Sequence, residues 1–65
     1  MIDRVRGAVV ARGADYLSVD LGAVAVRVAT PPPVAAEASL GREVDLHTAL
    51  VVRQDSWTLF GFADA

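Results

Sequence analysis

Apolar and polar residues alternate along much of this 65-residue chain, and a period of two is typical of β-strands with one buried face. Residues 2–12, rich in Val and Ala, predict a long first strand with a bend or bulge at Gly7. Residues 16–29 alternate on both sides of Gly22 and predict a hairpin with a tight connection. The chain therefore begins with three predicted strands.

Three consecutive prolines at residues 31–33 end this sheet, because proline has no N–H to donate to a strand ladder. Residues 34–40 contain good helix formers, and Gly41 stands where the C-terminal cap of a helix is expected. A helix this short must be held in place by packing against the strands.

Two further strands are predicted near the end of the chain. Residues 44–52 give the longest regular alternation, and residues 57–62 follow as a short aromatic strand. Residues 53–56, between them, are polar or charged and predict a hairpin tip. The arms of this hairpin would hold the Arg53 guanidinium and the Asp55 carboxylate in solvent.

The predicted order of elements indicates an all-β fold. Five antiparallel strands with a short helix between the third and the fourth are the arrangement of the OB-fold, a small Greek-key barrel. An SH3-like barrel is the nearest alternative, but the helical segment favours the OB-fold. We assign residues 1–62 to one domain and residues 63–65 to a tail, since a chain of this length forms one domain at most.

Composition limits how such a domain is stabilised. A chain this short buries only about 60% of its unfolded surface, and without cysteine it has neither disulfides nor thiolate metal sites. The apolar content is nevertheless 54%, which indicates a partner interface. No apolar run approaches the ~20 residues of a membrane span, and residues 1–6 lack a signal-peptide core. We therefore expect a cytoplasmic protein without membrane contact.

The charge is acidic, with a net value of −2 and a pI near 5.0. This argues against a domain that binds nucleic acid by itself, which needs a basic stripe to neutralise phosphates. All six basic residues are Arg, which suits bidentate pairing with carboxylates and phosphates; a GC-rich genome would give the same bias. Arg4 and Arg6 share one strand face, where they could pair with acids across a subunit boundary, contact DNA phosphate or stay solvated.

No catalytic or metal-binding pattern stands out. His47 is the single histidine and lies mid-strand without nitrogen or sulfur partners, so we interpret it as a surface or interface residue rather than a metal ligand. The carboxylates form no pair beside a nucleophile, and the glycines form no phosphate-binding loop. We therefore expect no enzyme active site, no metal and no cofactor.

Three of the four aromatic residues lie in the last predicted strand. Phe60 and Phe62 share one face, and Trp57 takes the other face beside the tip. Exposed aromatics of OB-folds can stack on bases. Because no basic groove accompanies them, we favour core packing with a partly exposed Trp57 over a stacking platform.

Three segments resemble the N-terminal domain of the RuvA family, the Holliday-junction-binding subunit of the bacterial branch-migration machine. Residues 1–7 have the Met-Ile start, basic residues and glycine of that family, and residues 19–28 are similar to its glycine-rich stretch before the third strand. Residues 48–62 give the strongest match, with Val-Val-Arg-x-Asp followed by Leu-aromatic-Gly-Phe. The chain departs from the glycine and aromatic positions of the pattern at Ala23, Ala25, Val26 and Phe60.

The resemblance implies a role in homologous recombination, DNA repair and the SOS response. A RuvA subunit has three domains and forms a tetramer, with the OB-fold at its centre. The second domain grips junction DNA through helix-hairpin-helix motifs, and the third contacts RuvB, the ATP-driven motor of the helicase complex. Residues 63–65 would then begin the linker to a second domain that this chain does not include.

The resemblance also implies that the hairpin tip is an acidic pin at the junction crossover. The pin positions are Gln54 and Asp55; the family usually has an acid at both, so Gln54 halves the formal charge of the pin. A carboxylate beside phosphates repels them, which would guide strands apart and keep the junction mobile. Arg53 would orient Asp55 or contact phosphate.

Two other readings of the sequence remain. A stand-alone OB-like module for protein–protein interaction, with no DNA role, would account for the low pI and the apolar excess. A single-strand-binding OB domain is the third, and the acidic charge disfavours it.

Overall fold

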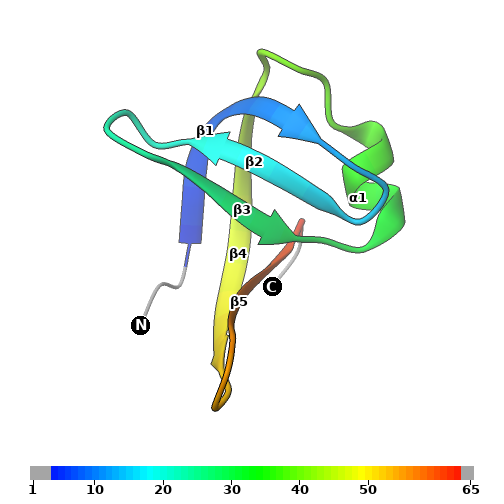
Figure 1. Ribbon diagram of the computed structural model, residues 1–65. Helices are drawn as coiled ribbons and strands as arrows, with labels where there is room; N and C mark the ends of the chain where they lie inside the picture. Colours follow the sequence, from blue (N-terminus) through cyan, green and yellow to red (C-terminus); the bar gives the residue numbers. More distant parts are fainter. Residues whose placement is uncertain (1–3, 64–65) are drawn as a thin grey trace.

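The computed structural model describes residues 4–63 as a closed five-stranded barrel with one short helix (Figure 1). The elements are β1 (Arg4–Arg12), β2 (Tyr16–Asp20), β3 (Ala25–Ala29), α1 (Pro32–Glu37), β4 (Glu43–Val52) and β5 (Trp57–Phe62). The strands follow the order β1-β2-β3-β5-β4, and β4 pairs with β1 to close the barrel. The predicted all-β OB-fold, with its helix between the third and fourth strands, is confirmed.

Strand pairing is antiparallel with one exception. β3 and β5 run parallel and pair at a single position, Ala29 opposite Phe60. The expectation of five antiparallel strands is therefore wrong at this seam. After β3 the chain passes through α1 and β4, and β5 runs antiparallel to β4. β5 therefore runs in the same direction as β3, and the two strands can only pair in parallel.

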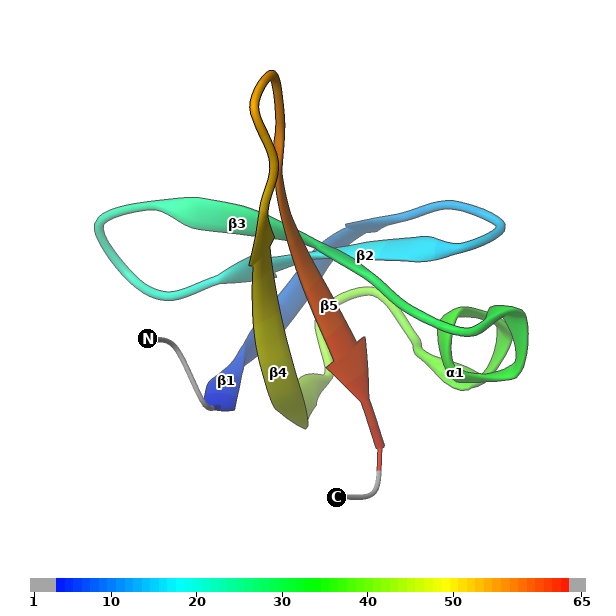
Figure 2. The same ribbon diagram turned by 90° about the horizontal axis from the view of Figure 1, so that it is seen from below.

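The core lies inside the barrel and under the helix, which sits on the side opposite the β2–β3 turn (Figure 2). It is built mainly from the inward-facing residues of all five strands. Its buried members are Val5, Val9, Leu17, Val19, Val28, Ala35, Ala38, Leu46 and Leu59. They are small or medium aliphatic residues, which suits the narrow interior of a five-stranded barrel.

The first strand differs from its prediction in where it bends. The register of β1 against β2 shifts between Val9 and Ala11, so the bulge is not at Gly7. Gly7 serves close approach instead: a Cβ there would lie 2.1 Å from the Asp20 carbonyl oxygen. Residues 2 and 3 of the predicted strand lie outside the described residues.

The helix begins earlier and ends earlier than residues 34–40. Pro32 and Pro33 occupy its first turn, where a missing N–H costs nothing and the fixed φ of proline is already helical. It ends because Ala38 is extended, with φ −75° and ψ 140°. Gly41, at φ +83°, therefore belongs to the turn before β4 and not to a helix cap; its N–H donates to the Val9 carbonyl at 2.8 Å.

The β4–β5 hairpin extends beyond the barrel as a finger (Figure 2). Its pairing runs without interruption from His47 opposite Phe62 to Val52 opposite Trp57. The tip stands clear of both α1 and the β2–β3 turn. None of the helical segments within residues 4–63 is long and apolar enough to cross a bilayer.

Candidate nucleic-acid interface at the β4–β5 tip

The tip is closed by one hydrogen bond, from the Arg53 N–H to the Ser56 carbonyl at 2.7 Å. Gln54 and Asp55 are the two central residues, and all four residues of the tip are exposed. Among the described residues only Gly22 and Gly41 have positive φ, so the tip uses no left-handed residue. Primed two-residue turns require positive φ, which glycine adopts most easily. This tip is not a primed turn, so it needs no glycine.

The predicted site residues Arg53, Gln54 and Asp55 are thus brought together at the far end of the finger. No ion pair joins Arg53 to Asp55 among residues 4–63. The Asp55 carboxylate is exposed, and no hydrogen bond or ion pair with another described residue uses its oxygens. The geometry gives no support to an orienting role for Arg53, and its contact with phosphate stays a prediction.

Arg4 and Arg6 lie elsewhere, on the outer face of β1 opposite the half of β4 that is farther from the tip. The Arg4 Nε donates to the Asp45 Oδ1 at 2.6 Å, and the Arg6 Nε lies 3.8 Å from the Glu43 Oε1. Both pairs are exposed. The hydrogen bond from Arg4 holds the pKa of Asp45 below its ordinary value, and the same bond raises the pKa of Arg4.

Both pairs join β1 to β4 within the chain. Each guanidinium already has a carboxylate beside it, which reduces its attraction for a phosphate. The two arginines thus face acids of the neighbouring strand, and their contacts with another subunit or with DNA phosphate stay predictions.

The sequence predicted that Phe60 and Phe62 pack in the core, and the structure shows that they do not. Phe60 is only partly buried and Phe62 is 44% exposed, because both lie on the outer face of β5. The inner face of that strand carries Leu59 and Gly61. Trp57 shares the parity of Leu59 but lies beyond the barrel end, next to the tip, and is 75% exposed. The expected exposure of Trp57 is therefore met and exceeded.

Arg12 has a structural role that sequence reasoning missed. Its guanidinium reaches across from β1 and donates to the carbonyls of Ala36, at 3.4 Å, and Ala38, at the end of α1. The last turn of α1 has no basic residue of its own. Nothing in the local sequence signals this contact, because residues 12 and 38 meet only through the fold. Within the described range no cluster of three potential metal ligands forms.

Comparison with known proteins gives the family of this chain. The family described as the RuvA N terminal domain matches residues 1–61. The chain belongs to the RuvA N-terminal domain family. Relatives named "Holliday junction branch migration complex subunit RuvA" include those of Beutenbergia cavernae, 49% identical over 65 residues, and Thermobifida fusca, 48% identical over 64. The protein of that name from Cutibacterium acnes is 42% identical over 65 residues.

These alignments cover nearly all of this chain, 98% to 100%, but only 32% of each relative. The chain thus spans about a third of the length of the RuvA proteins that it matches. The RuvA N-terminal match confirms the family inferred from residues 48–62 and does not favour an unrelated interaction module. It also places the exposed tip of the finger inside the matched range.

Proposed function

We propose that this domain acts in Holliday-junction branch migration and that its β4–β5 tip is a pin at the junction crossover. The observation that carries the proposal is the tip itself, a finger of paired strands that ends in an unpaired, exposed Asp55. The family membership supplies the context, since the relatives are named as subunits of the branch migration complex.

The finger has the properties that such a pin needs. Six consecutive pairs between β4 and β5 make it stiff, so that a load at the tip does not bend it easily. A carboxylate at its end repels phosphates that approach. Repulsion of this kind separates strands without binding them tightly, which leaves the crossover free to move.

The domain would serve as a non-catalytic part of a larger assembly. ATP-driven motion would come from the RuvB motor through another part of the protein. Four copies around the junction would bring four tips together. The exposed apolar side chains of the barrel, among them Val10 and Leu40, are candidates for the contacts between copies.

The pin is tested by Asp55→Asn in the complete protein. We expect the branch-migration rate, measured with RuvB and a synthetic four-way junction, to fall several-fold while the junction Kd changes less than about twofold. The reason is that Asp55 acts on strands at the crossover, whereas affinity depends on phosphate contacts made elsewhere.

Gln54→Glu is the matched variant, because it adds a carboxylate at the neighbouring position without changing the size of the side chain. We expect it to leave the rate unchanged or raise it. Equal losses of rate and affinity in Asp55→Asn, or no change in either, would contradict the pin.

A further inference from the structure

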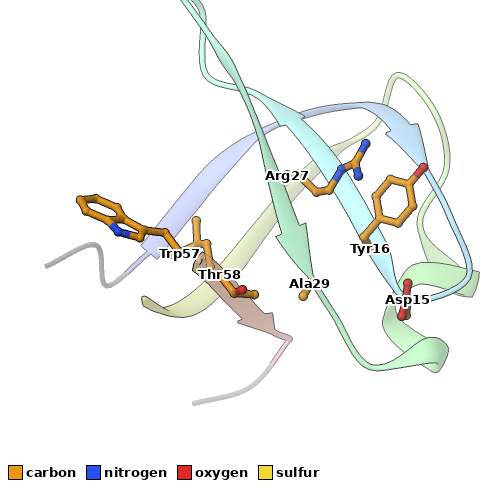
Figure 3. Close-up of a pocket in the computed structure, with 7 residues that line it drawn as sticks. Asp15, Tyr16, Arg27, Ala29, Trp57 and Thr58 are labelled. Carbon is orange, nitrogen blue, oxygen red and sulfur yellow. The ribbon is translucent and has the colours of Figure 1, made fainter. Parts of the chain in front are cut away.

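A hollow of about 330 Å³ lies beside the tip, between the β2–β3 hairpin and the base of the finger (Figure 3). Its size is at the lower end of the range for small-molecule sites, roughly 300–1,000 Å³. Tyr16 and Arg27 line one side of the hollow and Trp57 lies at the other side, with its indole directed away from them. Ala29 and Thr58 make the floor between them.

The Tyr16 side of the hollow is fixed in place. A Cβ on Gly13 would lie 2.1 Å from Cε2 of the Tyr16 ring, so the ring rests directly against the Gly13 backbone. On its other side the Arg27 guanidinium lies over the ring, 4.4 Å from the centroid. The turn is tied down as well, because the Gly13 N–H donates to the Tyr16 carbonyl and the Thr30 N–H to the Asp15 carbonyl.

Arg27 is held by this ring and by nothing else in residues 4–63. The guanidinium has no hydrogen bond or ion pair with any described residue. Arg4, Arg6 and Arg12 all have protein acceptors, so Arg27 differs from them. The guanidinium is planar, is held in position by the ring, and has N–H donors without a protein acceptor. These properties suit a ligand that offers acceptors and a flat face.

Trp57 supplies the second flat surface. Its indole is 75% exposed, a large apolar surface for so small a domain to leave in solvent. Its neighbour across the finger is Val52, which is also exposed. The ring therefore stands at the base of the tip with its face available for stacking.

We infer that this hollow, the Trp57 pocket, receives an unpaired nucleobase of the junction at the moment when pairs exchange at the crossover. Aromatic and guanidinium planes stack on every base, since every base has a π-face. The Arg27 donors and the Asp15 carboxylate match the mixed acceptors and donors on a Watson–Crick edge. A phosphate is a poorer fit, because Asp15 lines the same hollow.

The position of the pocket matches this use. It lies on the β2–β3 face next to the β1–β2 and β4–β5 connections, a region where OB-folds bind oligonucleotides. The inference rests on the proposed function, which puts the tip at the crossover. A strand deflected by the Asp55 carboxylate would pass the Trp57 ring next along the finger. The pocket would then shield a base that has left one partner and not yet met the next.

The test is photo-crosslinking of 5-iodouracil to the complete protein. The base is placed in a four-way junction either at the crossover or in the middle of an arm, and mass spectrometry locates the crosslinked residue. We expect a crosslink at Trp57 from the crossover position and at least about fivefold less from the arm, because stacking is worth that much or more per base. Trp57→Phe should keep the crosslink at residue 57.

Arg27→Gln distinguishes a base bound in the pocket from a base that only lies near Trp57. It leaves Trp57 in place, and we expect it to lower the Trp57 crosslink about fivefold while the junction Kd changes less than about twofold. Arg42→Gln, at an exposed arginine away from the hollow, is the matched control and should change neither value.

Three results would overturn the inference. One is an equal Trp57 crosslink from arm and crossover, and another is an Arg27→Gln crosslink equal to that of the wild type. The third is a change in the oligomeric state of Trp57→Ala or Arg27→Gln by light scattering, which would make the hollow a contact between copies. Absence of junction binding by the wild-type protein would instead refute the proposed function, and the pocket with it.

Discussion

Gly61 lies in β5 where the strand passes directly over the core. A Cβ at this position would be 2.5 Å from Cγ1 of Val28 and 3.3 Å from Cδ1 of Leu46. Val28 is fully buried, so either its side chain or the β5 backbone would have to shift. The glycine of the Leu-aromatic-Gly-Phe pattern is therefore required by packing and not by an unusual backbone angle, a distinction that the sequence alone does not make.

Gly61→Ala should destabilise the chain by about 1–3 kcal/mol, as overpacked core positions do. The measurement is the free energy of unfolding in urea. In Gly61→Ala/Val28→Ala the overlapping methyl group is gone, so the double variant should lose less than the sum of the two single losses. Strict additivity, or a loss below 0.5 kcal/mol for Gly61→Ala (about the spread of neutral surface changes), would contradict the overlap.

Residue identity predicted the tip well and the pocket poorly. Arg53, Gln54 and Asp55 are neighbours in the sequence, so any hairpin brings them together. The Trp57 pocket joins residues from a turn and three strands that are far apart along the chain. Only the three-dimensional arrangement brings Tyr16 and Arg27 together opposite Trp57, which is why Arg27 was not a candidate from sequence.

At the scale of elements, alternation located all five strands because each has one face against the barrel interior. It did not show which face of β5 is buried: Leu59 lies inside, whereas Phe60 and Phe62, which were expected in the core, lie on the outer face. The helix was misplaced because its first turn is made of prolines, which usually mark the end of regular structure. Proline is also compatible with the first turn of a helix. A run of prolines can therefore mark either the end of one element or the start of a helix.

The short α1 depends on Arg12 for its C-terminal contacts, so Arg12→Gln should destabilise the chain by about 1 kcal/mol. Arg12→Lys should lie between, because it keeps the charge without the planar array of donors. Urea unfolding measures both. Arg42→Gln, at an exposed arginine, should be neutral; an equal loss in that control would show a general charge effect instead of a specific contact.

At the scale of the whole molecule, charge distribution matters more than any single site. The net charge is −2, and two of the six basic residues are already beside carboxylates. A domain of this kind offers few cations to a phosphate backbone. Its composition therefore predicts weak DNA binding by this domain alone, and under the proposed function tight DNA binding would belong to other parts of a larger protein.

The 65-residue chain alone should bind a four-way junction no better than non-specifically, with a Kd of roughly 10⁻⁴–10⁻⁶ M at physiological salt. It should also fail to distinguish the junction from a duplex. Fluorescence anisotropy with labelled junction and duplex measures both, and the complete protein is the positive control. Tight, junction-selective binding by residues 1–65 would contradict this prediction.

β3 and β5 are joined through the single pair of Ala29 and Phe60, whereas every other neighbouring pair of strands shares at least four positions. This β3–β5 seam is therefore the place where local unfolding would open the barrel with the least loss of hydrogen bonds. The Trp57 pocket lies beside this seam, lined by Ala29 of β3 and by Trp57, Thr58 and Leu59 of β5. A base bound in the Trp57 pocket would hold β3 and β5 together. Binding of the base and rigidity of the whole barrel would then rise together.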